Sequence, residues 1–282
     1  AYLLSSELST YLSGRYVEIK MLPLSFREFQ DFYTFPPDMG KTEKLTLYMQ
    51  FGGMPSLKEY NFAEPQTGEM LDSIYNTVLM KDIVSRAPIR DVNVLQKLVR
   101  FMADNVGNMT SVNKITNTLF NEKSLSSPNN KTIESYIGLL ESAFIFYRAN
   151  RYDIKGKEYL RSREKYYIVD SGLRNYLLGR ISDTGRILEN IVFFELLRRG
   201  YNVSVGKVED KEIDFVATKT DKKIYIQVTE TLAGEETRQR ELAPLRMVRD
   251  NFEKVILTTD SLFTGTTEDG IRILNLADWL LG

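Results

Sequence analysis

The chain has 282 residues, of which 43% are hydrophobic, 27% charged and 11% aromatic, a composition that excludes a disordered chain and suits one or more buried cores. It contains no cysteine and no histidine, which excludes disulfides, thiolate chemistry, cysteine-ligated metals and the usual histidine-dependent hydrolases. Its 37 basic and 38 acidic residues give a formal net charge of −1, so overall charge favours no polyanionic partner. No segment approaches the ~18 consecutive apolar residues of a membrane span, so we expect a soluble protein of the cytoplasm with no membrane partner.

The first third of the chain is predicted to be mostly helical. The patterns predict a helix over 3–12, a short strand over 15–22, a helix after Ser25, and helices over 44–51 and 69–84. Ser25 is followed three residues later by Glu28, the spacing of a capping box, which sets the start of the second of these helices. Two glycines and a proline in 51–55 predict the turn between the later helices.

Three short helices and two strands are predicted next. Apolar spacing predicts helices over 92–105, 111–121 and 129–142, and two apolar runs predict strands over 144–151 and 165–169, flanking a charged loop over 155–164. Three helices followed by a hairpin are typical of a winged helix. We therefore assign 86–182 to a winged-helix domain.

The last hundred residues mix helices and strands. The patterns predict a helix over 186–199, strands over 201–205, 212–217 and 223–229, a helix over 235–251, a strand over 252–259, an apolar run over 271–276 and a final helical turn over 277–281. This order predicts an α/β domain over 183–282, with helices on a mixed sheet.

Acidic side chains alternate along the predicted strand over 212–217. A strand period of two places Glu212 and Asp214 on one face and Ile213 and Phe215 on the other. One face of this strand is therefore expected to be acidic and the other to lie in the core.

The following predicted strand carries two more polar side chains on one face, Gln227 and Thr229. If the two strands are neighbours in a hairpin, Asp214 and Gln227 point to the same side, and Glu189 on the preceding helix becomes a third oxygen donor. Without cysteine or histidine, any metal must be a hard cation on oxygen ligands, and Mg²⁺ on such a set holds a phosphodiester and activates water.

Several short motifs occur in an order found in one known family. They are Leu4-Ser-Ser-Glu-Leu, Leu12-Ser-Gly-Arg, Pro23-Leu-Ser-Phe-Arg-Glu-Phe, Gly52-Gly-Met-Pro, Val169-Asp-Ser-Gly-Leu-Arg and Leu188-Glu-Asn-Ile-Val. With Asp214 after them, this order resembles a bacterial and archaeal family of AAA-type P-loop ATPases that end in a winged helix and a restriction-endonuclease-like, PD-(D/E)XK domain. The resemblance spans almost the whole chain. It implies an α/β architecture in which a helical remnant of the ATPase lid, over 1–85, precedes the winged helix and the nuclease-like domain.

The resemblance also implies a degenerate nuclease-like site. In that fold an Asp ends one strand, an acid-x-Lys triplet lies on the next strand, and a Glu often comes from the first helix. Asp214 and Glu189 match, but the triplet has Gln227 and Thr229 in place of the acid and the lysine. These four residues would form the catalytic site, with Mg²⁺ bound weakly or not at all by Asp214, Gln227 and Glu189.

The nucleotide-binding half of the resembling ATPases would precede Ala1. Gly40-Lys41-Thr42 is similar to the tail of a P-loop, but Phe35 stands where the motif needs its first glycine. We therefore expect ATP and Mg²⁺ to bind only to a full-length parent protein. Arg15 resembles a phosphate-sensing or finger arginine of such ATPases, and a surface ion pair explains it equally well.

Positive charge gathers in the segment 148–186, which holds ten basic and five acidic residues. Lys155, Lys157, Arg161 and Arg163 fall on the expected wing of the winged helix, where phosphate contacts of DNA would be made. A solvated protein face explains these charges about as well.

We expect this chain to be the C-terminal part of an AAA-type ATPase, whose winged helix and degenerate, inactive nuclease-like domain bind DNA or a protein partner. One alternative is an active Mg²⁺-dependent nuclease that uses Gln227 as a ligand and borrows its cation from Lys223, Arg238 or Arg240. The other is a protein-interaction platform that binds no nucleic acid. Salt-sensitive DNA binding separates the platform from the other two.

Overall fold

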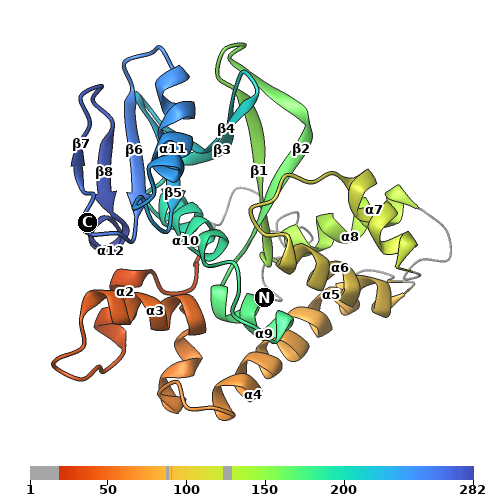
Figure 1. Ribbon diagram of the computed structural model, residues 1–282. Coiled ribbons are helices and arrows are strands. Elements are labelled where there is room, and N and C mark those ends of the chain that lie inside the picture. Colours follow the sequence, from red (N-terminus) through yellow and green to blue (C-terminus); the bar gives the residue numbers. More distant parts are fainter. Residues whose placement is uncertain (1–18, 87–88, 90, 123–128) are drawn as a thin grey trace.

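The computed structural model describes residues 19–86, 89, 91–122 and 129–282. The predicted helix over 3–12 and Arg15 lie outside these residues. Residues 19–22 are the described end of the predicted strand over 15–22, and they form no strand because they pair with no neighbour in the described sheet. The fold is α/β, with helices around one mixed sheet of eight strands (Figure 1).

The N-terminal region is helical, as the sequence predicts. Its elements are α2 (Phe26–Phe32), α3 (Lys41–Phe51), a 3₁₀ turn (Pro55–Tyr60), α4 (Gln66–Ser73), a π-helical segment (Ile74–Met80) and α5 (Lys81–Arg86). The capping box at the start of α2 is confirmed: the Ser25 amide donates to Glu28 Oε2 at 2.7 Å, and the Glu28 amide donates to Ser25 Oγ at 3.2 Å. The predicted helix over 69–84 is a continuous run of α4, the π-helical segment and α5.

Two of the sequence motifs meet where the N-terminal helices contact α9 (Ser171–Leu178), a helix that the sequence patterns did not predict. Asp170 caps α9 by accepting the Leu173 amide at 2.9 Å, and its second oxygen accepts the Gly53 amide at 2.7 Å. Gly52 has φ +75°, and a Cβ there would lie 2.2 Å from Asp170 Oδ1. Only glycine fits at this contact, which ties the N-terminal helices to the rest of the chain.

The middle region contains the three predicted helices and the predicted hairpin. These are α6 (Val92–Asp104), α7 (Val112–Asn121), α8 (Asn130–Ser142), β1 (Phe146–Asp153) and β2 (Glu158–Ile168). Asp91, Ser111 and Asn129 cap the three helices with their side chains. The predicted loop over 155–164 is largely wrong, because antiparallel pairing with β1 continues to Asp153↔Glu158 and makes most of it strand.

The remaining elements complete the sheet and cover it. They are α10 (Thr184–Arg198), β3 (Asn202–Val208), β4 (Lys211–Lys219), β5 (Lys222–Thr229), α11 (Glu235–Met247), β6 (Glu253–Thr258), β7 (Gly265–Thr266), β8 (Arg272–Asn275) and α12 (Leu276–Leu281). The strand order is β2-β1-β3-β4-β5-β6-β8-β7, with parallel and antiparallel pairs, so the predicted mixed sheet is confirmed. Because β1 pairs with β3 in parallel, the sheet continues across the expected boundary at 182/183.

Each face of the sheet has its own core. Phe215 and Ile226 belong to the larger core, which includes α10, and Val216 and Tyr225 belong to a second core, which includes α11. No helix in the described ranges is long and apolar enough to cross a bilayer.

Strand β4 contains a bulge that changes one expectation. Ser204 of β3 pairs with Val216, and Gly206 pairs with Ile213, so β4 has one extra residue between these pairs. The expectation that Ile213 and Phe215 share a face is therefore wrong, since the extra residue turns Ile213 into the α11 core and leaves Phe215 in the α10 core. Asp214 lies in this bulge.

Candidate functional site

A buried lysine lies at the centre of the expected acidic site. Lys165 Nζ lies 2.9 Å from Glu189 Oε1, 2.6 Å from Glu212 Oε1 and 3.8 Å from Asp214 Oδ1. Its side chain is only 3% exposed. We call Lys165, Glu189, Glu212 and Asp214 the lysine cluster. The structure thus brings together both acidic residues of β4 and the helical Glu189, around a cation that the sequence analysis counted only as part of the basic segment 148–186.

Three elements position the lysine cluster. Asn190 on α10 accepts the Ile168 amide at 2.9 Å and donates to the Ile168 carbonyl at 2.8 Å, which fixes α10 against the end of β2. The preceding residue, Glu189, therefore faces the β2 side chains, where it also accepts the Tyr167 hydroxyl at 2.6 Å. Gly107, between α6 and α7, has φ +74°, and a Cβ there would lie 3.0 Å from Glu189 Oε2. The cluster thus lies where the middle region meets the sheet.

Burial and mutual charge set the electrostatics of the lysine cluster. Burial, and then the neighbouring Glu189 carboxylate, raise the pKa of Asp214 to about 8, although Lys165 and the Val228 amide act to lower it. Burial alone would lower the pKa of Lys165, but the carboxylates of Glu189, Asp214 and Glu212 outweigh it and raise that pKa. Lys165 is therefore a cation at neutral pH, and Asp214 keeps its proton to a higher pH than an exposed aspartate does.

Gln227 and Thr229 are held outside the lysine cluster. Gln227 Oε1 accepts the Asp214 amide at 2.9 Å, and its Nε2 donates to Glu241 Oε2 on α11 at 3.0 Å. In return, Asp214 Oδ2 accepts the Val228 amide at 2.9 Å. Thr229 Oγ1 donates to the Thr231 carbonyl at 3.2 Å. Gln227 thus stabilises the bulge of β4, and in the described part of the chain no hydrogen bond joins it to Glu189 or Lys165.

The three cations that the nuclease alternative would borrow are engaged elsewhere. Arg238 pairs with Glu235, and Arg240 Nη2 pairs with Glu241 Oε1 at 3.0 Å. Lys223 Nζ lies near the rings of Tyr152 and Phe252, at 5.7 and 4.9 Å from their centroids. One feature of the sequence could have indicated that Lys165 is the cation at this site. Strand alternation places Lys165 on the same face of β2 as Tyr167, which is buried.

The lysine cluster does not fit a divalent cation in this arrangement. Mg²⁺ needs converging oxygen ligands with room for the ion and its waters. Here the Lys165 ammonium lies between the carboxylates, and no group of three acidic side chains in the described residues is arranged to hold a metal. The cation that neutralises these carboxylates belongs to the chain itself.

The expected DNA-contacting residues divide between exposed and buried positions. Lys155 and Lys157 are exposed at the tip of the β1–β2 hairpin, Arg163 is exposed farther along β2, and the side chain of Arg161 lies outside the described residues. Of the other cations in 148–186, Lys165 and Arg174 are buried. Arg148 and Arg180 are exposed but pair with Glu141 and Asp104, so fewer uncompensated cations reach the surface than the charge count suggested.

Comparisons with known proteins place the chain among relatives from both bacteria and archaea. It is 44% identical over 283 residues to an uncharacterized protein of Haemophilus influenzae, covering all of this chain and 69% of the relative. It is 31% identical over 304 residues to the uncharacterized protein MJ1544 of Methanocaldococcus jannaschii, covering 99% of this chain and 66% of the relative. The chain thus spans about two thirds of the length of each of these relatives.

No solved structure matches the chain significantly. Residues 42–184 match a family described as a domain of unknown function, DUF8612. These residues run from α3 to the start of α10, and so include the Gly53–Asp170 contact and Lys165. The chain belongs to the DUF8612 family.

Proposed function

We propose that this chain is the C-terminal part of an AAA-type ATPase, and that it binds duplex DNA without cleaving it. In this proposal the N-terminal helices are a lid remnant, α6 to α8 with the β1–β2 hairpin are a winged helix, and the remaining α/β elements are a restriction-endonuclease-like domain. The order of these elements and the motif resemblance support the assignment.

The β1–β2 hairpin is the observation that carries the proposal. Lys155 and Lys157 at its tip and Arg163 farther along β2 are exposed and available to phosphates. Near its base, Lys165 is buried among carboxylates and can reach no ligand in solution. One strand, β2, therefore supplies a cation to the binding surface and another that neutralises the nuclease-like site.

The exposed face of α8 adds to the binding surface. Lys131 and Ser135 are exposed one turn apart on α8, while Ile133 and Tyr136 of the same helix are buried. In winged helices and related folds, a helix of this position enters the major groove, and the wing contacts phosphates. Polar, exposed residues on α8 suit that role.

The active nuclease is the less favoured alternative. It needs a free amide oxygen on Gln227 and a borrowed cation, whereas Gln227 bonds to the Asp214 amide and Glu241, and the borrowed cations pair elsewhere. No contact in the described residues specifically favours the protein-interaction platform. It is the alternative that the DNA-binding experiment below would support if no binding is found.

Fluorescence anisotropy with a labelled DNA duplex tests the binding. The affinity should fall as salt rises from about 50 to about 200 mM, and the double variant Lys155→Ala, Lys157→Ala should reduce the salt slope by roughly two units. The matched control is Lys41→Ala, Lys58→Ala, which removes two exposed lysines from the N-terminal helices. Absent or salt-independent binding by the wild-type chain would favour the platform.

A plasmid-nicking assay with Mg²⁺ and with Mn²⁺ tests the absence of cleavage. We expect supercoiled DNA to stay intact at protein concentrations that saturate binding. Nicking that is lost in Asp214→Asn would instead establish the nuclease alternative, because it would tie cleavage to the lysine cluster. The Asp214→Asn variant, purified in the same way, is the control for contamination. Nicking that persists in this variant would come from a contaminating enzyme.

A further inference from the structure

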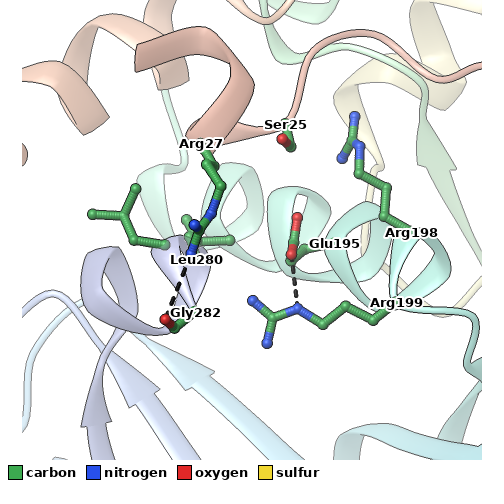
Figure 2. Close-up of a pocket in the computed structure, with 8 residues that line it drawn as sticks. Ser25, Arg27, Glu195, Arg198, Arg199, Leu280 and Gly282 are labelled. Atoms are coloured by element: carbon green, nitrogen blue, oxygen red, sulfur yellow. Dashed lines mark hydrogen bonds and ion pairs between the residues drawn. The ribbon is translucent and has the colours of Figure 1, made fainter. Parts of the chain in front are cut away.

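A cavity rich in arginine lies far from the lysine cluster along α10, where α2 and α12 meet the end of that helix (Figure 2). It has a volume of about 240 Å³. Its lining includes Ser25 and Arg27 of the N-terminal region, Glu195, Arg198 and Arg199 of α10 and its C-terminal end, and residues of α12. Side chains from elements far apart in the sequence thus converge on one space.

The cavity carries an excess of positive charge. Three guanidinium groups line it, and among the described lining residues Glu195 is the single acidic side chain. Glu195 Oε1 accepts from Arg199 Nε at 2.7 Å and so neutralises one of the three. Within the described residues, Arg27 and Arg198 have no ion-pair partner within 4.0 Å, and their hydrogen bonds go to backbone carbonyls of Gly282 and Pro23. After the hydrogen bond from the Ser25 amide, Arg198 also acts to lower the pKa of the Glu28 carboxyl, so it lies close to that acid. Among the described lining residues, Arg27 is therefore the arginine least compensated by acidic side chains.

The arginines at the end of α10 are held in place before any ligand arrives. The Arg199 guanidinium lies over the Trp279 ring, 4.0 Å from its centroid, and donates to the Trp279 carbonyl at 2.5 Å. Arg198 is held by its bond to the Pro23 carbonyl. Each guanidinium has five N–H donors, so these few bonds leave donors for a further acceptor. An ordered arginine pays less entropy when it binds an oxyanion.

We infer that this cavity binds a phosphate group. Its volume is below the roughly 300–1,000 Å³ of pockets for drug-sized ligands, and therefore suits a small anion or one phosphate of a larger molecule. Arginine is the side chain best matched to phosphate, because its planar N–H donors meet two oxygens at once. The phosphate would bridge α2 and the end of α10 by contacting Arg27 and Arg199, whose guanidinium groups lie on the same side of the cavity in Figure 2. Its source is either free inorganic phosphate or the phosphates of a nucleotide.

Isothermal titration calorimetry of the purified chain at constant ionic strength tests this inference. Inorganic phosphate should give saturable heat that an equal ionic strength of chloride does not, and Arg27→Gln should weaken the binding about tenfold, since it removes a charged donor. Arg27 is exposed and makes one long hydrogen bond of 3.5 Å, so this variant keeps the fold. Arg180→Gln is the matched control, because Arg180 is an exposed arginine paired with Asp104 outside the cavity.

A second variant should change the phosphate affinity in the opposite direction. Glu195→Gln removes the side-chain carboxylate that lines the cavity and should tighten phosphate binding several-fold, whereas a structural role of Glu195 predicts no gain. Tighter binding of ATP than of inorganic phosphate, lost in Arg27→Gln, would assign the site to a nucleotide; equal affinities would assign it to free phosphate. Phosphate heats that match chloride, or that are the same in wild type, Arg27→Gln and Glu195→Gln, would overturn the inference.

Discussion

Helix α10 contributes to two ionic clusters of opposite composition. In the lysine cluster one cation faces three carboxylates, and in the arginine cavity three cations face one acidic side chain. In the first the cation is buried, with Lys165 3% exposed, although Glu212 is 35% exposed, and the second is an open space of about 240 Å³. A buried cluster must contain its own counterion and protonate what it cannot neutralise, whereas an open one can take its counterion from solution.

The largest expected effect follows from removing the buried cation. Lys165→Met leaves Glu189, Glu212 and Asp214 facing each other without compensation, and it should lower the free energy of unfolding by about 3–5 kcal/mol. Urea denaturation followed by circular dichroism measures this change. Lys222→Met, at an exposed position at the start of β5, is the matched control and should change stability by less than about 0.5 kcal/mol. Equal effects of the two variants would show that Lys165 is not the counterion of the cluster.

In a variant that lacks Lys165, a metal ion should take the place of the ammonium group. The lysine cluster would then take its counterion from solution, as the arginine cavity does. In Lys165→Met the three carboxylates are free to bind Mn²⁺, which should restore about 2–3 kcal/mol at ~100 times its Kd. The wild-type chain, whose ammonium lies between the carboxylates, should gain nothing from the same concentration. Thermal denaturation with and without Mn²⁺ compares the two proteins. Equal stabilisation of both would indicate metal bound elsewhere on the surface.

The pH dependence of stability reports the proton held by the lysine cluster. The pKa of Asp214 is raised to about 8 by burial and by Glu189, above the ~3.9 of an unfolded aspartate. Between these values the folded chain binds more protons than the unfolded chain. The contribution of Asp214 is therefore fully present below about pH 4 and is lost as pH rises towards 8, by at most about 1.4 kcal/mol per pH unit. Urea denaturation at about pH 5 and about pH 8 should show this loss in the wild type.

The control for the pH dependence is a pair of asparagine variants. Asp214→Asn should flatten the decline in stability, since it removes the titrating carboxyl. Asp210→Asn, at an exposed position in the β3–β4 turn, should leave the decline unchanged. A decline that is identical in the wild type and Asp214→Asn would assign the titration to another group.

The smallest effect is expected in the arginine cavity. Arg27→Gln should change the free energy of unfolding by no more than about 0.5 kcal/mol, because its guanidinium is exposed and bonds weakly to one carbonyl. Urea denaturation without phosphate measures this value. A loss as large as that of Lys165→Met would contradict the distinction between a buried and an open cluster.

Much of the fold followed from local patterns. The capping box of Ser25 and Glu28, the apolar spacing over 111–121 and 129–142, and the strand patterns of β4 and β5 are short-range signals, and the elements they predict are confirmed. Glu189 and Asp214 were expected at one site from strand alternation and from the family resemblance, and both lie within 4.0 Å of Lys165 Nζ.

What the sequence missed depends on contacts between distant segments. Lys165 was counted as a surface charge, because nothing local reveals that Asn190 fixes α10 on Ile168 and brings Glu189 to it. The bulge at Asp214 depends on the register of β3 and β4, and period-two counting cannot include an extra residue. The arginine cavity needs α2, α10 and α12 together, and no spacing along the chain predicts their meeting.

The parallel pairing of β1 with β3 has a consequence for how this protein can be divided. Cutting the chain at 182/183 would leave β1 and β3 each with an open edge where they now share hydrogen bonds from Arg151↔Val205 to Asp153↔Lys207. Open edges of this kind recruit other chains and promote aggregation. Separate expression of the middle and C-terminal regions is therefore a route to insoluble material, and co-expression of the two pieces would allow the missing ladder to form between them.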